Sequence, residues 1–278
     1  LLNLPAASKN CHSIGLLNAL FTATSAVCVT GLVVADTFTQ FSIFGQIVIM
    51  VLIQMGGLGI MTMATLVFLL LGKKITLRER LVMQEALNQL TLSGLVKLTR
   101  HILLTTIAFE GVGAILLSIR FTQFYGLGRG LYYGLFHAVS AFNNAGFDLL
   151  GGFRSLTSFV EDPIINIVIM SLIVFGGLGF SVIYDILSTK DFRRLSLHSK
   201  VVIIMTSILL FSGIIMFYAL ECANPKTMGA LTPTGKMLAA AFQSVTTRTA
   251  GFNTINCSDL TVPSKYLTIL LMFIGASP

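Results

Sequence analysis

The chain has 278 residues, of which 55% are hydrophobic and only 10% are charged, and its mean hydropathy is +0.88. Soluble domains usually carry about 25% charged residues, so this composition excludes an ordinary soluble protein and indicates an integral membrane protein. The net charge of +7 does not indicate nucleic-acid binding, because the basic residues lie between apolar runs and not in a stripe mixed with aromatic residues. We therefore expect membrane lipid, and no nucleic acid, around this chain.

Apolar segments of two lengths alternate along the chain. Long runs cover 43–71, 102–119, 163–187 and 201–220, and a fifth begins near Val262. Each is near the roughly 20 residues that an α-helix needs to cross a bilayer. Three shorter stretches of 13 residues, at 13–25, 130–142 and 235–247, are too short to cross. The fifth run reaches Pro278 too early for a complete crossing, so we expect the sequence to be cut inside an element.

Two basic connections predict the topology. Residues 73–100 and 189–200 contain ten of the 18 Lys and Arg residues, which places both connections in the cytoplasm. Three apolar segments lie between them, and an odd number of crossings would put the connections on opposite sides. The short segment 130–142 should therefore enter from the outer face and return to it. The non-helical backbone that follows must be buried in protein or line a water-filled cavity.

A glycine motif follows each short stretch. The segments are "AVCVTGL" at 26–32, "FNNAGFD" at 142–148 and "TRTAGFN" at 247–253, and they align on Gly31, Gly146 and Gly251. A second glycine, on the next apolar helix, comes 25, 30 and 24 residues later, at Gly56, Gly176 and Gly275. The pattern predicts a repeated unit of outer helix, re-entrant pore helix, glycine loop and inner helix.

Glycine loops of this kind suit a monovalent cation. Glycine lets the backbone adopt conformations that direct several carbonyl groups towards one axis, and a ring of carbonyls can replace the water shell of the ion. The C-terminal ends of the pore helices add roughly half a negative charge each. Asp36, Asp148 and Asp259 follow the three glycines and are expected at the outer mouth, where they would concentrate cations.

The segments "TATSAVCVTGLVVADT", "FHAVSAFNNAGFD", "QSVTTRTAGFNT" and "LLMFIGASP" resemble the Trk/Ktr/HKT superfamily of potassium transporters, most closely its KtrB membrane subunits. The resemblance implies an all-α membrane protein with four units in a pseudo-fourfold, potassium-channel-like arrangement around one pore. It implies potassium uptake across a bacterial inner membrane by a multi-pass homodimer, with a cytosolic nucleotide-binding ring of the KtrA/TrkA type as partner. Sodium is a candidate activator.

The resemblance also divides the chain and assigns its site residues. Repeat 1 covers 1–72 without its outer helix, repeat 2 covers 101–188, and repeat 3 covers 201–278 with a truncated inner helix, while the fourth unit is missing. The cytoplasmic connections are 73–100 and 189–200. The filter backbone maps to Cys28, Val29, Thr30, Gly31, Asn143, Asn144, Ala145, Gly146, Thr249, Ala250 and Gly251. Arg248 supports the filter, and the gate region begins at Gly275, Ala276, Ser277 and Pro278.

Several residues have plainer interpretations. Glycine commonly ends helices, and the side-chain amides of Asn143 and Asn144 can hold a loop without facing ions. The glycines of the two "GGLG" segments are better explained by close helix packing than by ion contact. Glu110 is the only acidic residue deep inside a spanning segment, and the sequence leaves open whether it is a partnered or a functional carboxylate.

Two other functions fit the sequence less well. A secondary transporter of another solute would use broken helices at the membrane midplane and would need intramembrane acid pairs for ion coupling. A membrane enzyme or scaffold has no support, since the cysteines and histidines lack metal-ligand spacing and no phosphate loop or nucleophile motif is present. We therefore expect no enzyme, no covalently bound cofactor, and potassium as the substrate.

Overall fold

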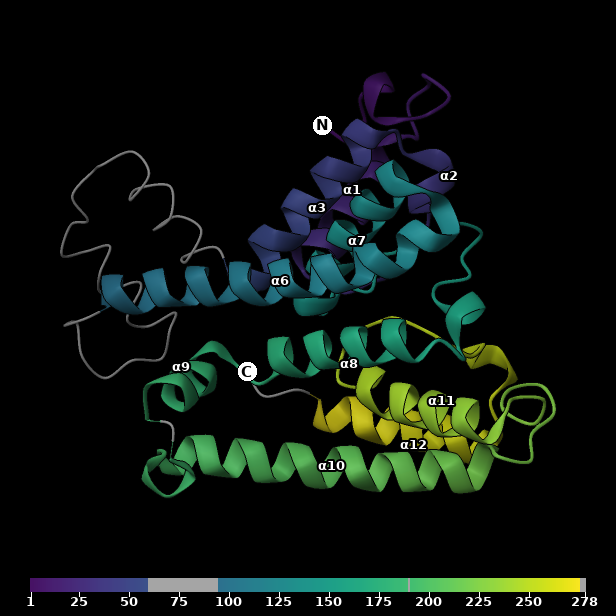
Figure 1. Cartoon of the computed structure of the whole chain (residues 1–278). Coiled ribbons are helices and arrows are strands. Elements are labelled where there is room, and N and C mark those ends of the chain that lie inside the picture. The colour runs from purple at the N-terminus through teal and green to yellow at the C-terminus, as the bar shows by residue number, and fades with distance from the viewer. Residues whose placement is uncertain (60–94, 190, 276–278) are drawn as a thin grey trace.

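The structure is a computed structural model that describes residues 1–59, 95–189 and 191–275 (Figure 1). The described residues form α-helices, short 3-10 helices and loops, and they contain no β-strand. This confirms the all-helical prediction for the described part of the chain. Most of the expected connection at 73–100, the end of the run at 43–71 and the gate residues Ala276, Ser277 and Pro278 lie outside the described residues.

The helices begin where capping residues and prolines predict. A polar side chain accepts hydrogen bonds from the first free backbone N–H groups of α3 (Ile43–Leu58), α8 (Pro163–Gly177), α10 (Leu197–Glu221) and α11 (Pro233–Thr246). The capping residues are Ser42, Asp162, Ser196 and Thr232. Proline occupies the first position of α8 and of α11, where its missing N–H costs nothing.

The N-terminal part contains η1 (Pro5–Ala7), the short helix α1 (Leu16–Val27), the single turn α2 (Thr37–Gln40) and α3. A glycine loop joins α1 to α2, and α3 packs against α1. The helix expected at 13–25 is therefore present, shifted by a few residues, and it is too short to cross a bilayer.

A tight helical hairpin follows. The long helix α6 (Leu95–Tyr125) turns at Gly126 into α7 (Leu127–Phe142), which packs back along it. An added Cβ at Gly130 would lie 2.5 Å from Thr122 Cα, and one at Gly134 would lie 2.6 Å from the backbone nitrogen of Ser118. Small residues thus let the two backbones approach closely, as in other membrane helix pairs.

The apolar run predicted as one crossing at 163–187 is two helices, α8 and α9 (Phe180–Thr189), bent by 97°. The break falls beside Gly179, whose φ of +87° cannot continue a right-handed helix. Arg120 near the end of α6 pairs with Asp162 at the start of α8 at 2.6 Å. His101 near the start of α6 contacts Tyr184 of α9, with ring centroids 5.5 Å apart.

These two contacts show that α6 and the α8–α9 pair run in opposite directions. The end of α6 and the start of α8 lie together at one end of the molecule, while the start of α6 and α9 lie together at the other. The chain leaves α6 and reaches α8 at the same end, although α7 and its loop intervene. A re-entrant segment requires such a path, and the re-entry of α7 into a membrane stays a prediction of the basic connections.

The C-terminal part contains α10, α11 and α12 (Val262–Ile274), with the short helices η3 (Phe192–Arg194) before α10 and η4 (Cys257–Asp259) before α12. The short helix η2 (Thr157–Phe159) lies between α7 and α8. Glu221 at the end of α10 is fully buried and accepts hydrogen bonds from the backbone N–H and the hydroxyl of Thr261, at 2.8 and 2.7 Å. Asn224 and Thr227 donate to its other oxygen. This carboxylate therefore holds the end of α10 against the start of α12.

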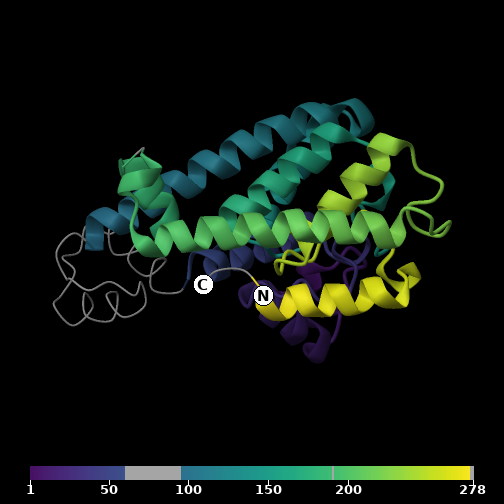
Figure 2. The ribbon, with the colours of Figure 1, turned by 90° about the horizontal axis from the view of Figure 1, so that it is seen from below.

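The described helices suit a bilayer. Thr99–Tyr125 and Leu197–Glu221 are long and apolar enough to cross a membrane, and the bent pair Pro163–Gly177 and Phe180–Thr189 is a third candidate. Figures 1 and 2 show the axes of α6, α8 and α10 roughly aligned with one another, although the chain runs along α6 and α8 in opposite directions. Large apolar side chains of α10, such as Phe211 and Ile215, are 68% exposed, which fits a surface that faces lipid. The chain is a multi-pass membrane protein.

Candidate functional site

The three glycine loops share one backbone conformation. The second residue of each loop, Val29, Asn144 or Thr249, has a φ of 53°, 55° or 68°. The fourth residue is Gly31, Gly146 or Gly251, with a φ of 76°, 71° or 78°. A left-handed conformation at a residue with a side chain costs roughly 1–2 kcal/mol. Because this conformation recurs at three equivalent positions, we infer that the surrounding structure holds the backbone in it. Such strained backbone is typical of functional loops.

A hydroxyl group from the last turn of each short helix holds the far side of its loop. Ser25 donates to the carbonyl of Leu32 at 2.8 Å, and Ser140 donates to that of Phe147 at 2.7 Å. Thr246 donates in the same way to the carbonyl of Phe252. Each acceptor is the residue directly after the loop glycine. The sequence reasoning missed these residues, although a hydroxyl five or six positions before each glycine was a visible signal.

The loops meet at one place. An added Cβ at Gly31 would lie 2.7 Å from the carbonyl oxygen of Ala145, and one at Gly146 would lie 2.7 Å from that of Ala250. One at Gly251 would lie 3.1 Å from Gly146 Cα and 3.8 Å from Gly31 Cα. The helices α1, α7 and α11 each lead directly into one loop, so three negative helix ends are directed at this point.

A cavity of about 150 Å³ adjoins the three glycines. Its lining includes the carboxylates of Asp36 and Asp148, but Asp259 is not part of it. Asp259 instead accepts a hydrogen bond from Asn256 at 2.8 Å in η4. The structure thus brings together two of the three aspartates expected at the outer mouth.

The two cavity aspartates differ in their environments. Burial tends to raise the pKa of Asp36, but hydrogen bonds from the backbone N–H groups of Thr39 and Phe153 outweigh it and hold the pKa below its ordinary value. Burial raises the pKa of Asp148 above its ordinary value, and the negative charge of Asp36 adds to this effect, against a hydrogen bond from the backbone N–H of Leu150. Asp148 is therefore the first of the two to take up a proton as the pH falls.

The side chains at the start of the loops hold backbone and neighbouring helices. Asn143 donates to the carbonyl of Val139 at 2.8 Å, and it also contacts polar groups of α3 and α6. With the Asn144 amide oriented to donate, its nitrogen lies 3.3 Å from the carbonyl oxygen of Ala141 and 3.2 Å from that of Ile173. Both amides thus act in the bracing role that the sequence left open.

Arg248 occupies the position of Asn143 in the third loop. It is only 6% exposed, and its Nη2 lies 3.4 Å from the carbonyl oxygen of Gly177. Its Nε and Nη1 have no hydrogen-bond partner among the described residues. The guanidinium group lies beside the break between α8 and α9, in agreement with a supporting position next to the loop.

The first glycines of the two "GGLG" segments pack against the short helices. An added Cβ at Gly56 would overlap the carbonyl oxygen of Val27, and one at Gly176 would overlap that of Phe142. These carbonyls end α1 and α7, so α3 contacts α1, and α8 contacts α7, through a glycine. The geometry agrees with the packing interpretation. Gly275 ends α12 with a φ of 67°.

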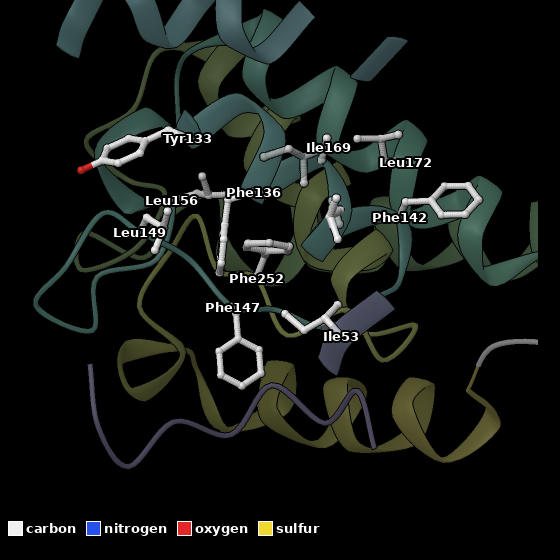
Figure 3. Close-up of a cluster of buried hydrophobic side chains, with 14 of the residues drawn as sticks. Ile53, Tyr133, Phe136, Phe142, Phe147, Leu149, Leu156, Ile169, Leu172 and Phe252 are labelled. Atoms are coloured by element: carbon white, nitrogen blue, oxygen red, sulfur yellow. The ribbon is translucent and has the colours of Figure 1, made fainter. Parts of the chain in front are cut away.

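An aromatic core surrounds the loops. The residues that follow two of the glycines, Phe147 and Phe252, belong to the same buried cluster as Phe136 and Ile53 (Figure 3). His137 of α7 is fully buried, and its Nδ1 lies 2.7 Å from the carbonyl oxygen of Tyr133, while its Nε2 accepts from the backbone N–H of Leu149 at 3.5 Å. This arrangement gives His137 a structural role in the packing behind the second loop.

The chain is similar to known proteins over nearly its whole length. The family model described as "TrkH: Cation transport protein" matches residues 2–278. The chain is 48% identical over 260 residues to the Ktr system potassium uptake protein B of Bacillus subtilis, covering 94% of this chain and 58% of that protein. It is 43% identical over 278 residues to the protein of the same name from Vibrio alginolyticus, covering 99% of this chain and 60% of the relative.

Two further comparisons agree. The potassium/sodium uptake protein NtpJ of Enterococcus hirae is 42% identical over 277 residues, covering the whole of this chain and 61% of that protein. The crystal structure of the potassium transporter TrkH from Vibrio parahaemolyticus superposes with a TM-score of 0.66 at 18% identity, covering 98% of this chain and 54% of that one. This last likeness shows the fold alone. The chain spans about three fifths of the length of the curated relatives.

Proposed function

Because the chain belongs to the TrkH family of cation transport proteins, we propose that it is the ion-translocating part of a potassium uptake protein. The observation that carries the proposal is the meeting of three loops with the same backbone conformation, each at the C-terminal end of a short helix. The names of three relatives, which refer to potassium or to potassium and sodium uptake, support potassium as the substrate.

In the proposed mechanism the loops form the selectivity filter. Backbone carbonyls from Cys28 to Gly31, from Asn143 to Gly146 and from Arg248 to Gly251 would replace the hydration shell of potassium. The negative ends of α1, α7 and α11 favour a cation at this point and disfavour an anion. Asp36 and Asp148 in the adjoining cavity would raise the local cation concentration.

The assembly belongs to the same proposal. We propose that a fourth unit completes the pore with pseudo-fourfold symmetry, which fits a chain that spans 58% to 61% of three relatives. A homodimer in a bacterial inner membrane, a cytosolic nucleotide-binding ring of the KtrA/TrkA type, gating near Gly275 and activation by sodium are parts of this proposal. The printed names of two relatives, which place them in a "Ktr system", support a system of several components.

The alternative of a secondary transporter gains no support from the described residues. It required intramembrane acid pairs, but the two oxygens of Glu110 accept hydrogen bonds from the neutral amides of Gln54 and Asn143. Among the described residues, the hydrogen-bond partners of this carboxylate are amides, and no second acid is hydrogen-bonded to it.

Ion binding at the loops tests the proposal directly. The complete gene that encodes this chain would be expressed in bacterial cells that lack potassium uptake, and growth at low potassium and rubidium uptake would be measured. Crystals of the purified protein soaked with rubidium should show anomalous density beside Gly31, Gly146 and Gly251. Failure to restore growth, or rubidium density only at sites away from these glycines, would refute the filter assignment.

The raised pKa of Asp148 predicts an acid-sensitive uptake. Above its pKa the carboxylate is charged and attracts cations, and as the pH falls through the raised pKa the group takes up a proton and the attraction is lost. We expect rubidium uptake to decline as the pH falls through the raised pKa of Asp148, and Asp148→Asn to lower uptake at pH 7 and remove the decline. The matched control Asp259→Asn lies outside the cavity and should keep the decline. The same acid limb in Asp148→Asn would disprove this assignment.

A further inference from the structure

A buried carboxylate lies directly behind the second glycine loop. Glu110 is in the middle of α6 and is only 7% exposed. Its Oε2 accepts a hydrogen bond from Nε2 of Gln54 on α3 at 3.2 Å, and its Oε1 accepts one from Nδ2 of Asn143 at 2.9 Å. The same Asn143 nitrogen lies 2.9 Å from Oε1 of Gln54. We call these three side chains the Glu110 network.

The network joins three elements at the loop. Asn143 is both the C-cap of α7 and the first residue of the second loop, so its backbone belongs to the proposed filter while its side chain bonds to Gln54 and Glu110. Gln54 lies on the inner helix of repeat 1, and Glu110 lies on the outer helix of repeat 2. The network therefore fixes the start of the loop relative to two helices from different repeats.

Glycine on α3 makes room for this contact. Gly57 lies one turn beyond Gln54, and an added Cβ there would overlap Oδ1 of Asn143 and lie 2.5 Å from its Cγ. In the alignment of the "GGLG" segments the equivalent residue is Gly177, whose carbonyl lies against Arg248. Asn143, the first residue of the second loop, thus contacts the second glycine of "GGLG" on α3. Arg248, the first residue of the third loop, contacts the equivalent glycine on α8.

The chemistry of the network requires a carboxylate at its centre. Both partners of Glu110 donate amide N–H groups, and only a carboxylate offers two acceptor oxygens in this arrangement. A glutamine would keep the shape but would direct an NH₂ group at one of the two donors. Charge-assisted hydrogen bonds are also stronger than neutral ones, especially where water is excluded.

We infer that Glu110, acting through Gln54 and Asn143, is a positioning residue for the second filter loop and thereby for the preference for potassium over sodium. The inference rests on the proposed function, because it concerns the ion selectivity of the same site. A loop whose carbonyls can shift loses the number and arrangement of ligands that distinguish the two ions. Glu110 does not contact the ion.

The first test compares ion selectivity. In the complete protein, Glu110→Gln should lower the preference for rubidium over sodium about tenfold, the effect of losing one charge-assisted hydrogen bond, while the protein level stays normal. Thr106→Val is the matched control, because Thr106 lies one turn earlier on α6, is fully buried, and its hydroxyl has no hydrogen-bond partner among the described residues. Unchanged selectivity in Glu110→Gln, or an equal loss in Thr106→Val, overturns the inference.

Two further variants alter the Glu110 network through residues outside α6. Asn143→Ala removes the link to the loop, and Gly57→Ala displaces the Asn143 side chain without touching Glu110. Both should reproduce the loss of selectivity, and Glu110→Gln combined with Asn143→Ala should lose no more than the larger single effect. Gly111→Ala is the control for Gly57→Ala, because nothing lies within 4 Å of an added Cβ there. Additive losses in the double variant overturn the inference.

Hydrogen exchange separates this inference from the proposed function. If the wild-type protein takes up no rubidium, the proposed function fails, and the backbone amides of residues 144–147 still report on the network. Faster exchange of these amides in Glu110→Gln than in Thr106→Val supports a positioning role. Equal exchange rates in the two variants overturn it.

Discussion

Replacing Gly146 by serine should abolish the preference for potassium over sodium while the protein still inserts into the membrane. Gly146 has a φ of 71°, a conformation that costs a residue with a side chain roughly 1–2 kcal/mol. An added Cβ would also lie 2.7 Å from the carbonyl oxygen of Ala250 and 2.8 Å from Gly251 Cα. The loops must therefore separate, and we expect at least a loss of about tenfold in the ratio of rubidium to sodium uptake.

The control for this substitution lies on the helix that leads to the loop. Gly128 is exposed on α7, its φ is not positive, and nothing lies within 4 Å of an added Cβ. Gly128→Ser should keep both uptake and selectivity. A Gly146→Ser protein with wild-type selectivity would remove the second loop from the filter, whatever the total rate of uptake.

Replacing Gly176 by valine should prevent the protein from accumulating in the membrane in a folded form. An added Cβ would overlap the carbonyl oxygen of Phe142, and this contact is to backbone at the end of α7, which cannot change rotamer. Overpacking of a well-packed core typically costs about 1–3 kcal/mol, and a backbone contact should reach at least the upper end of that range. Thermal unfolding in detergent and the yield of monodisperse protein measure the effect.

Gly111 provides the comparison for Gly176. It lies on α6 with open space around an added Cβ, so Gly111→Val should unfold at nearly the wild-type temperature. A Gly176→Val protein as stable as Gly111→Val would mean that α8 does not pack on the end of α7 as the structure shows. Reduced uptake without any loss of stability would instead assign Gly176 a role in conduction.

The short helices illustrate how much the sequence can reveal. The stretch expected at 130–142 is α7, Leu127–Phe142, and the stretch expected at 235–247 is α11, Pro233–Thr246. Both are bounded by glycine or proline and are apolar over too few residues for a crossing, so composition and length were enough to locate them. The distribution of basic residues then predicted the re-entrant path, since it depends only on charge and the number of crossings.

The bend between α8 and α9 shows what composition could not predict. The run at 163–187 is apolar throughout, and hydropathy does not distinguish a straight helix from one bent by 97°. The glycines of "GGLG" were visible, but whether a glycine in a helix packs or breaks depends on its neighbours in space. Here Gly176 packs against α7, whereas Gly179, three residues later, adopts a φ of +87° and ends the helical path.

The role of Glu110 shows the same limit at the site. The sequence marked it as an isolated intramembrane acid, but its partners Gln54 and Asn143 are 56 and 33 residues away along the chain. The motif at 142–148 marked Asn143 as a loop residue, but nothing in the sequence connected it with Gln54 or Glu110. Only the packing of α3 and α6 against the end of α7 brings the three side chains within hydrogen-bond distance.

Properties that depend on neighbours along the chain were determined by the sequence alone: the membrane class, the places of the short helices and the positions of the loop glycines. Tertiary structure decided which distant residues come together. It brings Gly31, Gly146 and Gly251 close to one another and places Asp36 and Asp148 in the lining of one cavity. It also gives Glu110 its hydrogen-bond partners. The physical reason is that hydropathy and backbone freedom are properties of a short segment. Hydrogen bonds and close packing between helices depend instead on the distances in space between residues that are far apart in the sequence.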